Sequence, residues 1–129
     1  MEFPAGLKYT KDHEWVKVDG KRVTVGITAF AVEQLGDVTL VTLDVKAGDD
    51  LVAGKAFGTI ESVKTLSDLY APISGKVIEV NGALDASPEL VNEDPYGKAW
   101  MIVIEAADPS AEGALLDAKA YGDHVKAST

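Results

Sequence analysis

The chain has 129 residues, 47% of them hydrophobic, and its 12 Lys and Arg against 21 Asp and Glu give a net charge of −9. This length and apolar content predict one folded domain spanning residues 1–129, not a disordered acidic tail. The absence of cysteine excludes disulfides, cysteine-based metal sites and thiol nucleophiles, while the acidic balance argues against nucleic acid and anionic membranes as partners.

The first regular structure predicted is a β-hairpin. Residues 22–27 alternate between apolar and polar or small side chains, a period of two that indicates a strand with one buried face. Residues 14–18 predict the partner strand. Between them lie Asp19 and Gly20, a pair typical of two-residue hairpin turns in which both positions need a positive φ.

A short helix is predicted next, followed by further strands. Thr28 is a good N-cap for a helix over residues 29–35, and Gly36 is typical of the position where a helix ends. Apolar runs bounded by glycine, proline and aspartate predict strands at residues 38–43, 57–60, 69–71, 76–80 and 100–104.

The remaining segments predict loops and a C-terminal helix. Residues 81–97 contain prolines, asparagines and glycines, which indicates a long irregular connection. Asp108 followed by Pro109 is a favourable helix start and predicts a helix from about residue 109 to about residue 125. Short, closely spaced strands with two helices favour a mostly β sandwich or barrel.

One predicted hairpin presents a lysine at its tip. Its arms are residues 57–60 and 69–72, and Gly54 and Gly75 bracket them. The midpoint of the arms and the midpoint of the two glycines both fall directly after Lys64. The symmetry of the segment therefore predicts that Lys64 lies at or next to an exposed turn.

Spacing alone leaves two interpretations of Lys64. It can be an ordinary solvated lysine, flanked in sequence by the carboxylates of Glu61 and Asp68. Alternatively, the turn presents the amine to another protein, since an exposed lysine is a usual target of acylation.

A family resemblance favours the second interpretation. It is carried by an ordered series of motifs extending from about residue 7 to about residue 121: residues 58–65 (GTIESVKT), 67–77 (SDLYAPISGKV), 7–10, 13–16, 25–28, 34–37, 80–81, 88–92, 94–97 and 100–101. In these motifs the chain resembles the H-protein family of the glycine cleavage system, whose members are lipoyl carriers. The resemblance implies a β-sandwich of the biotinyl/lipoyl (barrel-sandwich hybrid) type, with a short internal helix and a C-terminal helix.

The resemblance also implies site residues. Lys64 is expected to receive lipoic acid in an amide linkage, and Glu61 to be recognised by the enzyme that attaches it, although Glu61 also fits a solvated turn carboxylate. His13 is a candidate contact of the lipoyl arm, with a structural hydrogen-bonding role as its alternative. Residues 92–94 either shape a cleft for the arm or form turns. No catalytic residue and no metal ligand is expected.

The function implied is that of a shuttle which itself catalyses no step. The expected partners are a pyridoxal-phosphate glycine decarboxylase, an aminomethyltransferase, dihydrolipoamide dehydrogenase and a lipoate-attaching enzyme. The lipoyl group would carry the aminomethyl group between the first two enzymes and be reoxidised by the third. We expect a monomer. We expect it in the cytoplasm, because the N-terminal residues do not resemble a signal or transit peptide.

Three alternative functions differ from this interpretation. A lipoyl or biotinyl carrier domain of another multienzyme complex fits less well, because Val63 and Thr65 flank the lysine where biotin carriers usually have methionines. A chain that relays lipoate to other enzymes is not separated from the main interpretation by sequence. An acid–base enzyme using carboxylates with His13 lacks any recognisable catalytic constellation.

Overall fold

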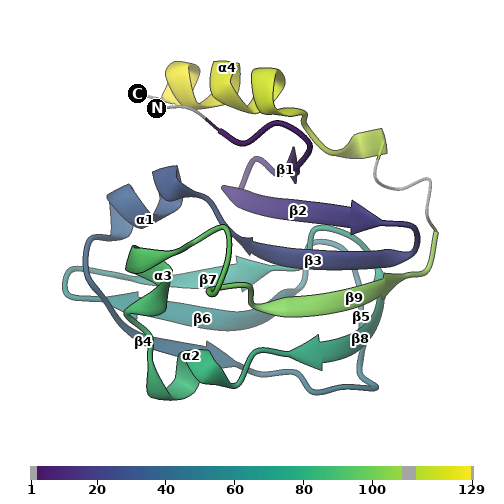
Figure 1. Cartoon of the computed structure of the whole chain (residues 1–129), viewed down its shortest axis with the longest axis horizontal. Helices are drawn as coiled ribbons and strands as arrows, with labels where there is room; N and C mark the ends of the chain where they lie inside the picture. The colour runs from purple at the N-terminus through teal and green to yellow at the C-terminus, as the bar shows by residue number, and fades with distance from the viewer. Residues whose placement is uncertain (1–2, 109–112, 129) are drawn as a thin grey trace.

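Two antiparallel sheets face each other across a hydrophobic core (Figure 1). The structure, a computed model, describes residues 3–108 and 113–128. One sheet has, in spatial order, the strands β1 (Lys8–Tyr9), β2 (Glu14–Asp19), β3 (Arg22–Ile27), β9 (Ile102–Ala106), β8 (Gly75–Val80) and β5 (Asp50–Leu51). The other sheet has, in spatial order, the strands β4 (Val38–Leu43), β6 (Ala56–Ser62) and β7 (Leu66–Tyr70). The mostly β sandwich predicted from the sequence is confirmed.

Four helices complete the described part of the chain: α1 (Ala29–Leu35), α2 (Ala83–Ala86), α3 (Leu90–Glu93) and α4 (Ala118–Ser128). The bounds of α1 are those that the sequence predicts. The Thr28 hydroxyl accepts a hydrogen bond from the Ala31 amide at 3.2 Å, and Gly36 ends the helix with φ of 77°. The two short helices α2 and α3 lie within the segment predicted to be irregular.

The β2–β3 hairpin differs from its prediction by one residue. Asp19 pairs with Arg22 across the strands, so the loop consists of Gly20 and Lys21. Gly20 has a φ of 62°, whereas Lys21 does not have a positive φ. This pattern, with glycine first, is typical of a type II′ turn, which matches strand twist as well as the expected type I′ turn does.

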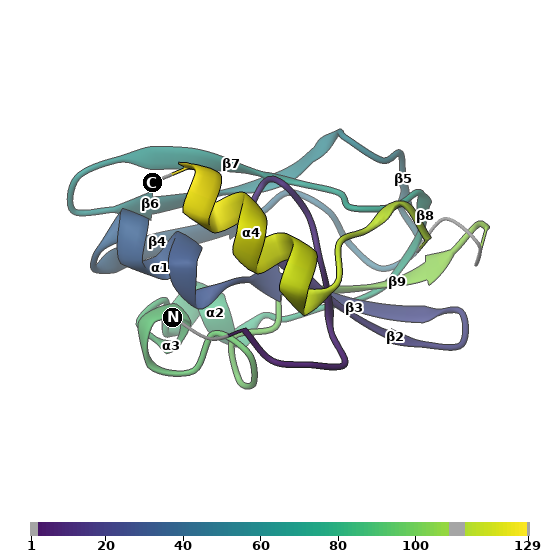
Figure 2. The same ribbon diagram turned by 90° about the horizontal axis from the view of Figure 1, so that it is seen from above.

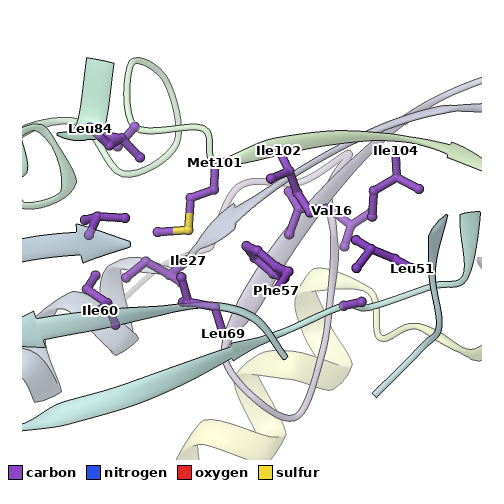
Figure 3. Packing of buried hydrophobic residues seen from close by; sticks show 14 of the residues in the cluster. Val16, Ile27, Leu51, Phe57, Ile60, Leu69, Leu84, Met101, Ile102 and Ile104 are labelled. Atoms are coloured by element: carbon purple, nitrogen blue, oxygen red, sulfur yellow. The ribbon is translucent and has the colours of Figure 1, made fainter. Parts of the chain in front are cut away.

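The core lies between the two sheets. Figure 3 shows Ile60 and Leu69 of the smaller sheet pointing toward Ile27 and Met101 on the opposite side. Phe57 is fully buried between the sheets. Phe57 and Ile60 of β6 and Leu69 of β7 belong to this core, so core packing anchors the hairpin that carries the connecting turn.

The C-terminal helix begins later than predicted. Pro109 lies outside the described residues, but Leu116 is extended, because it exchanges backbone hydrogen bonds with Tyr9 at 2.7 and 2.8 Å. An extended residue cannot belong to a helix, so α4 starts at Ala118. Its Tyr121 ring stacks on Tyr9 with centroids 4.7 Å apart. Within the described residues, no helix combines the length and apolar character that crossing a membrane would require.

Candidate functional site

Lys64 lies in the turn between β6 and β7, as the symmetry of the sequence predicts. Figure 2 shows this hairpin reaching the end of the molecule beyond α1. We call residues 62–65 the lysine turn. The Ser62 amide donates to the Thr65 carbonyl at 2.8 Å, and the Ser62 hydroxyl accepts from the amides of Lys64 and Thr65 at 3.3 and 3.2 Å. The buried serine therefore fixes the backbone while the lysine side chain stays exposed.

The lysine turn is held from a second direction by the connection between α1 and β4. The Val63 amide donates to the Asp37 carbonyl at 3.0 Å. Asn92 of α3 braces the same connection, because its side chain accepts from the Val38 amide at 2.9 Å and donates to the Gly36 carbonyl at 2.8 Å. Asn92 thus supports the lysine turn indirectly and does not line the cleft described below.

The ammonium group of Lys64 is available for reaction. Among residues 3–108 and 113–128 it makes no ion pair. Its aliphatic stem passes beside Gly36, where a Cβ atom would lie 3.7 Å from Lys64 Cε. An exposed primary amine on a fixed turn has the geometry that an acylating enzyme needs, since the enzyme can approach it from outside.

A cleft of about 180 Å³ opens beside the lysine turn. Its walls come from the segment before β2, from α1 and from the inner side of the β6–β7 hairpin. Apolar side chains such as Ile60 and Leu69 form its floor, and the carboxylate-bearing residues Asp12, Glu14 and Asp68 line it. An apolar floor with carboxylates suits a ligand that has a hydrocarbon body and a cationic end.

Glu14 is the most unusual residue of the cleft, and it was not among the site residues predicted. Only 2% of it is exposed. Its carboxylate accepts hydrogen bonds from the Tyr70 amide at 2.8 Å and from the Thr10 hydroxyl at 3.4 Å. Burial raises the pKa of Glu14 to about 8, although the Tyr70 amide opposes the shift. A signal was present in the sequence, because Glu14 shares its strand face with Val16, which is a core position.

His13 lines the cleft but is also part of the packing under α4. Its Nδ1 atom lies 2.9 Å from the Tyr121 hydroxyl, which in turn lies 2.7 Å from Thr28 Oγ1. Burial, followed by the nearby His124, lowers the pKa of His13. Its φ of 68° is the only positive value among the described non-glycine residues. These contacts support the structural alternative for His13 and leave its contact with an arm as a proposal.

The predicted residues therefore separate into two groups. His13 and the exposed Asp68 line the cleft, whereas Glu61 lies on the opposite face of the hairpin. No group of three or more His, Asp or Glu side chains in the described part of the chain is arranged to hold a metal ion.

The chain is similar along almost its whole length to proteins of one family. The family model "Glycine cleavage H-protein" matches residues 7–128. The glycine cleavage system H protein of Bacteroides thetaiotaomicron is 54% identical over 121 residues, which are 94% of this chain and 95% of the relative. That of Bacillus pumilus is 52% identical over 126 residues, 98% of each chain. The crystal structure of the H protein from Mycobacterium marinum matches with a TM-score of 0.87 and 40% identity, covering 96% of this chain and 99% of that one.

Proposed function

Because the chain belongs to the glycine cleavage H-protein family, we propose that it carries lipoic acid on Lys64 and shuttles the aminomethyl group derived from glycine. The observation that supports this proposal most strongly is that Lys64 is exposed on the braced turn between β6 and β7. This hairpin reaches the end of the molecule (Figure 2). The partners would be the glycine decarboxylase, the aminomethyltransferase and dihydrolipoamide dehydrogenase. The chain would act in the cytoplasm and catalyse no step itself.

The residues present fit an amide-linked lipoyl group. Lys64 supplies a free amine, and the neighbouring cleft combines an apolar floor with carboxylates. When bound, the lipoyl group would supply a disulfide that accepts the aminomethyl group and holds two electrons as a dithiol. The chain would supply attachment, orientation and a high local concentration near each docked partner.

In this proposal the cleft shelters the cargo-bearing end of the arm. Ile60 and Leu69 would cover its apolar part and exclude water. The carboxylates of Asp12, Glu14 and Asp68 would face the amine of the cargo, which is a cation at neutral pH. A cation beside Glu14 favours its ionised form, so binding of the amine would lower the raised pKa of Glu14.

Mass spectrometry of the intact chain tests the attachment. The wild-type chain, incubated with lipoate, ATP and a lipoate-attaching enzyme, is expected to gain the mass of one lipoyl group. Lys64→Arg keeps the positive charge but removes the acceptor amine, and is expected to gain nothing. Lys55→Arg, a nearby lysine substitution outside the turn, is the matched control and should be modified like wild type. Modification of Lys64→Arg would contradict the proposal.

A further inference from the structure

Three side chains link α4 to the start of α1 through hydrogen bonds. His13 Nδ1 lies 2.9 Å from the Tyr121 hydroxyl, and this hydroxyl lies 2.7 Å from Thr28 Oγ1. Thr28 Oγ1 also accepts from the Ala31 amide at 3.2 Å, which is the N-cap bond of α1. Tyr121 and Thr28 are both fully buried. We call His13, Tyr121 and Thr28 the relay.

α1 is both a wall of the cleft and a support of the lysine turn. The side chains that it contributes to the cleft are those of Ala31, Gln34 and Leu35. The helix leads to Asp37, whose carbonyl accepts from the Val63 amide. A helix of only seven residues is not stable alone, so the position of α1 depends on its caps and its packing. A change at Thr28 therefore reaches the cleft and the lysine turn.

The number of protons in the relay determines the direction of its hydrogen bonds. Each hydroxyl has one proton to donate. Within residues 3–108 and 113–128, Thr28 Oγ1 has only the Ala31 amide and the Tyr121 hydroxyl as partners. The amide can only donate, so the Thr28 proton goes to the Tyr121 oxygen. The Tyr121 proton then goes to His13 Nδ1, which accepts it only while the imidazole is neutral.

Protonation of His13 reverses this order. An imidazolium donates from both of its nitrogens, so Tyr121 would have to turn its proton toward Thr28. Thr28 Oγ1 would then accept twice, and its own buried proton would have no acceptor, which is unfavourable. The N-cap of α1 would be weakened directly.

Titratable groups surround His13 from several elements. They are Asp12 and Glu14 on its own segment, Tyr121 and His124 on α4, and Asp68 across the cleft. α1 adds the uncharged ring of Phe30, whose centroid lies 4.8 Å from that of His13. Burial and then His124 lower the pKa of His13, whereas Asp12 opposes the shift. The fold thus favours the neutral imidazole that the relay needs.

Resting on the proposed function, we infer that Tyr121 is a positioning residue: through Thr28 it holds α1 as a wall of the arm cleft while His13 is neutral. Tyr121 does not line the cleft, and neither does any other residue of α4 in the described part of the chain. The C-terminal helix therefore controls a cleft from which it is absent. Acidification that protonates His13 loosens α1 and uncovers the cargo-bearing end of the arm.

Amide hydrogen exchange in the unlipoylated chain tests the link to α1. Tyr121→Phe keeps the ring that stacks on Tyr9 but removes the hydroxyl. It is expected to lower the protection factor of the Val32 amide, which bonds the Thr28 carbonyl, about tenfold. Thr28→Val should act alike, and Thr28→Ser, which keeps a hydroxyl, should resemble wild type. Tyr9→Phe is the matched control and should stay within about twofold of wild type, because the Tyr9 hydroxyl donates to Pro4 instead.

The pH dependence of this exchange tests the role of His13. Its pKa in the folded chain lies below the ordinary value of 6.5, so the closed form loses stability as the pH falls below 6.5. Between about pH 7.5 and pH 5.5 the protection factor of the Val32 amide is expected to fall about fivefold in wild type. His13→Asn cannot titrate in this range and suits a positive φ, so it should show no such fall.

Retention of the cargo gives a second measurement. After loading and removal of the decarboxylase, water can hydrolyse the sulfur–carbon bond of the cargo, which releases formaldehyde and ammonia and leaves the dithiol. Because an uncovered arm meets more water, Tyr121→Phe is expected to release ammonia faster than wild type by the same factor as its exchange. Tyr9→Phe should release it at the wild-type rate.

The outcomes separate this inference from the proposed function. If Tyr121→Phe protects the Val32 amide and retains cargo as Tyr9→Phe does, the inference is wrong while lipoylation of Lys64 stands. An equal loss of protection on acidification in wild type and His13→Asn would also contradict it. If wild type accepts no lipoyl group, the proposed function fails, and exchange in the unlipoylated chain still decides whether Tyr121 positions α1.

Discussion

At the scale of single residues, the site combines an exposed amine with a buried carboxylate. Lys64 is prominent in the sequence because the two hairpin arms are symmetrical about it. Glu14 is not prominent, because a glutamate at the start of a strand is ordinarily exposed. Only the approach of β7, whose Tyr70 amide donates to Glu14, shows that this carboxylate is enclosed. Strand alternation puts Glu14 on the same face as the core residue Val16, but its contact with Tyr70 joins residues 56 positions apart, so no local pattern predicts that hydrogen bond.

Ionisation of Glu14 should make the stability of the fold depend on pH. The pKa of Glu14 is about 8 in the folded chain, against an ordinary value of 4.5. Between these values the folded chain keeps a proton that the unfolded chain has lost, so stability falls as pH rises toward 8 and then levels off. Compared with Glu14→Gln, wild type is expected to lose on the order of 4 kcal/mol more between pH 5 and pH 9.

Urea unfolding of both proteins across this pH range measures the difference. Glu61→Gln serves as the control, because Glu61 is exposed and its substitution should leave the pH profile of wild type largely unchanged. Parallel profiles for wild type and Glu14→Gln would show that the buried carboxylate does not control this pH dependence.

At the scale of elements, the lysine turn is a braced structure. Ser62 closes it from within, Asp37 holds it from the α1–β4 connection, and Asn92 holds that connection in place. The sequence allowed residues 92–94 either to shape a cleft or to form turns. Asn92 does neither, because it does not line the cleft and its side chain bonds the backbone of a distant segment. A turn that is already ordered loses little entropy when an enzyme binds it.

Loss of the Asn92 side chain should loosen this brace. Asn92→Ala leaves the Val38 amide and the Gly36 carbonyl without their partners, so we expect a loss of about 1–3 kcal/mol in unfolding free energy. Hydrogen exchange at the Val38 and Val63 amides is expected to accelerate beyond the change caused by lower global stability.

Asn81→Ala is the matched control, since the Asn81 side chain bonds backbone groups of Ala83, Lys98 and Trp100 instead. It should reduce global stability without selective exchange at Val38 and Val63. Equal local exchange in the two variants would rule out a specific brace at Asn92.

Local signals also explain which elements the sequence predicts well. The bounds of α1 follow from Thr28 and Gly36, because capping depends on residues within one helical turn. The bulge near Leu40 and the short strand β1 depend on partners elsewhere in the chain. The predicted start of α4 was wrong for the same reason, since the bridge to Tyr9 keeps Leu116 extended and excludes a continuous helix through it.

At the scale of the whole molecule, the β6–β7 hairpin carries the exposed Lys64 at its turn and borders the cleft. Ile60 and Leu69 line the cleft from one side of the hairpin, and Glu61 lies on the other side. The net charge of −9 would become −10 after acylation of Lys64. Such an acidic surface favours brief contacts with basic partner surfaces, and salt weakens these contacts.

The absence of cysteine leaves no internal thiol to react with a bound disulfide.

Loading of the chain by glycine decarboxylase tests the central claim most directly. Lipoylated wild type, incubated with glycine and a pyridoxal-phosphate glycine decarboxylase, is expected to gain the mass of one aminomethyl group per chain, with release of one carbon dioxide. Lys64→Arg, prepared in the same way, is expected to gain nothing because it carries no arm. An unchanged mass of lipoylated wild type beside an active decarboxylase, or equal loading of Lys64→Arg, would contradict the account.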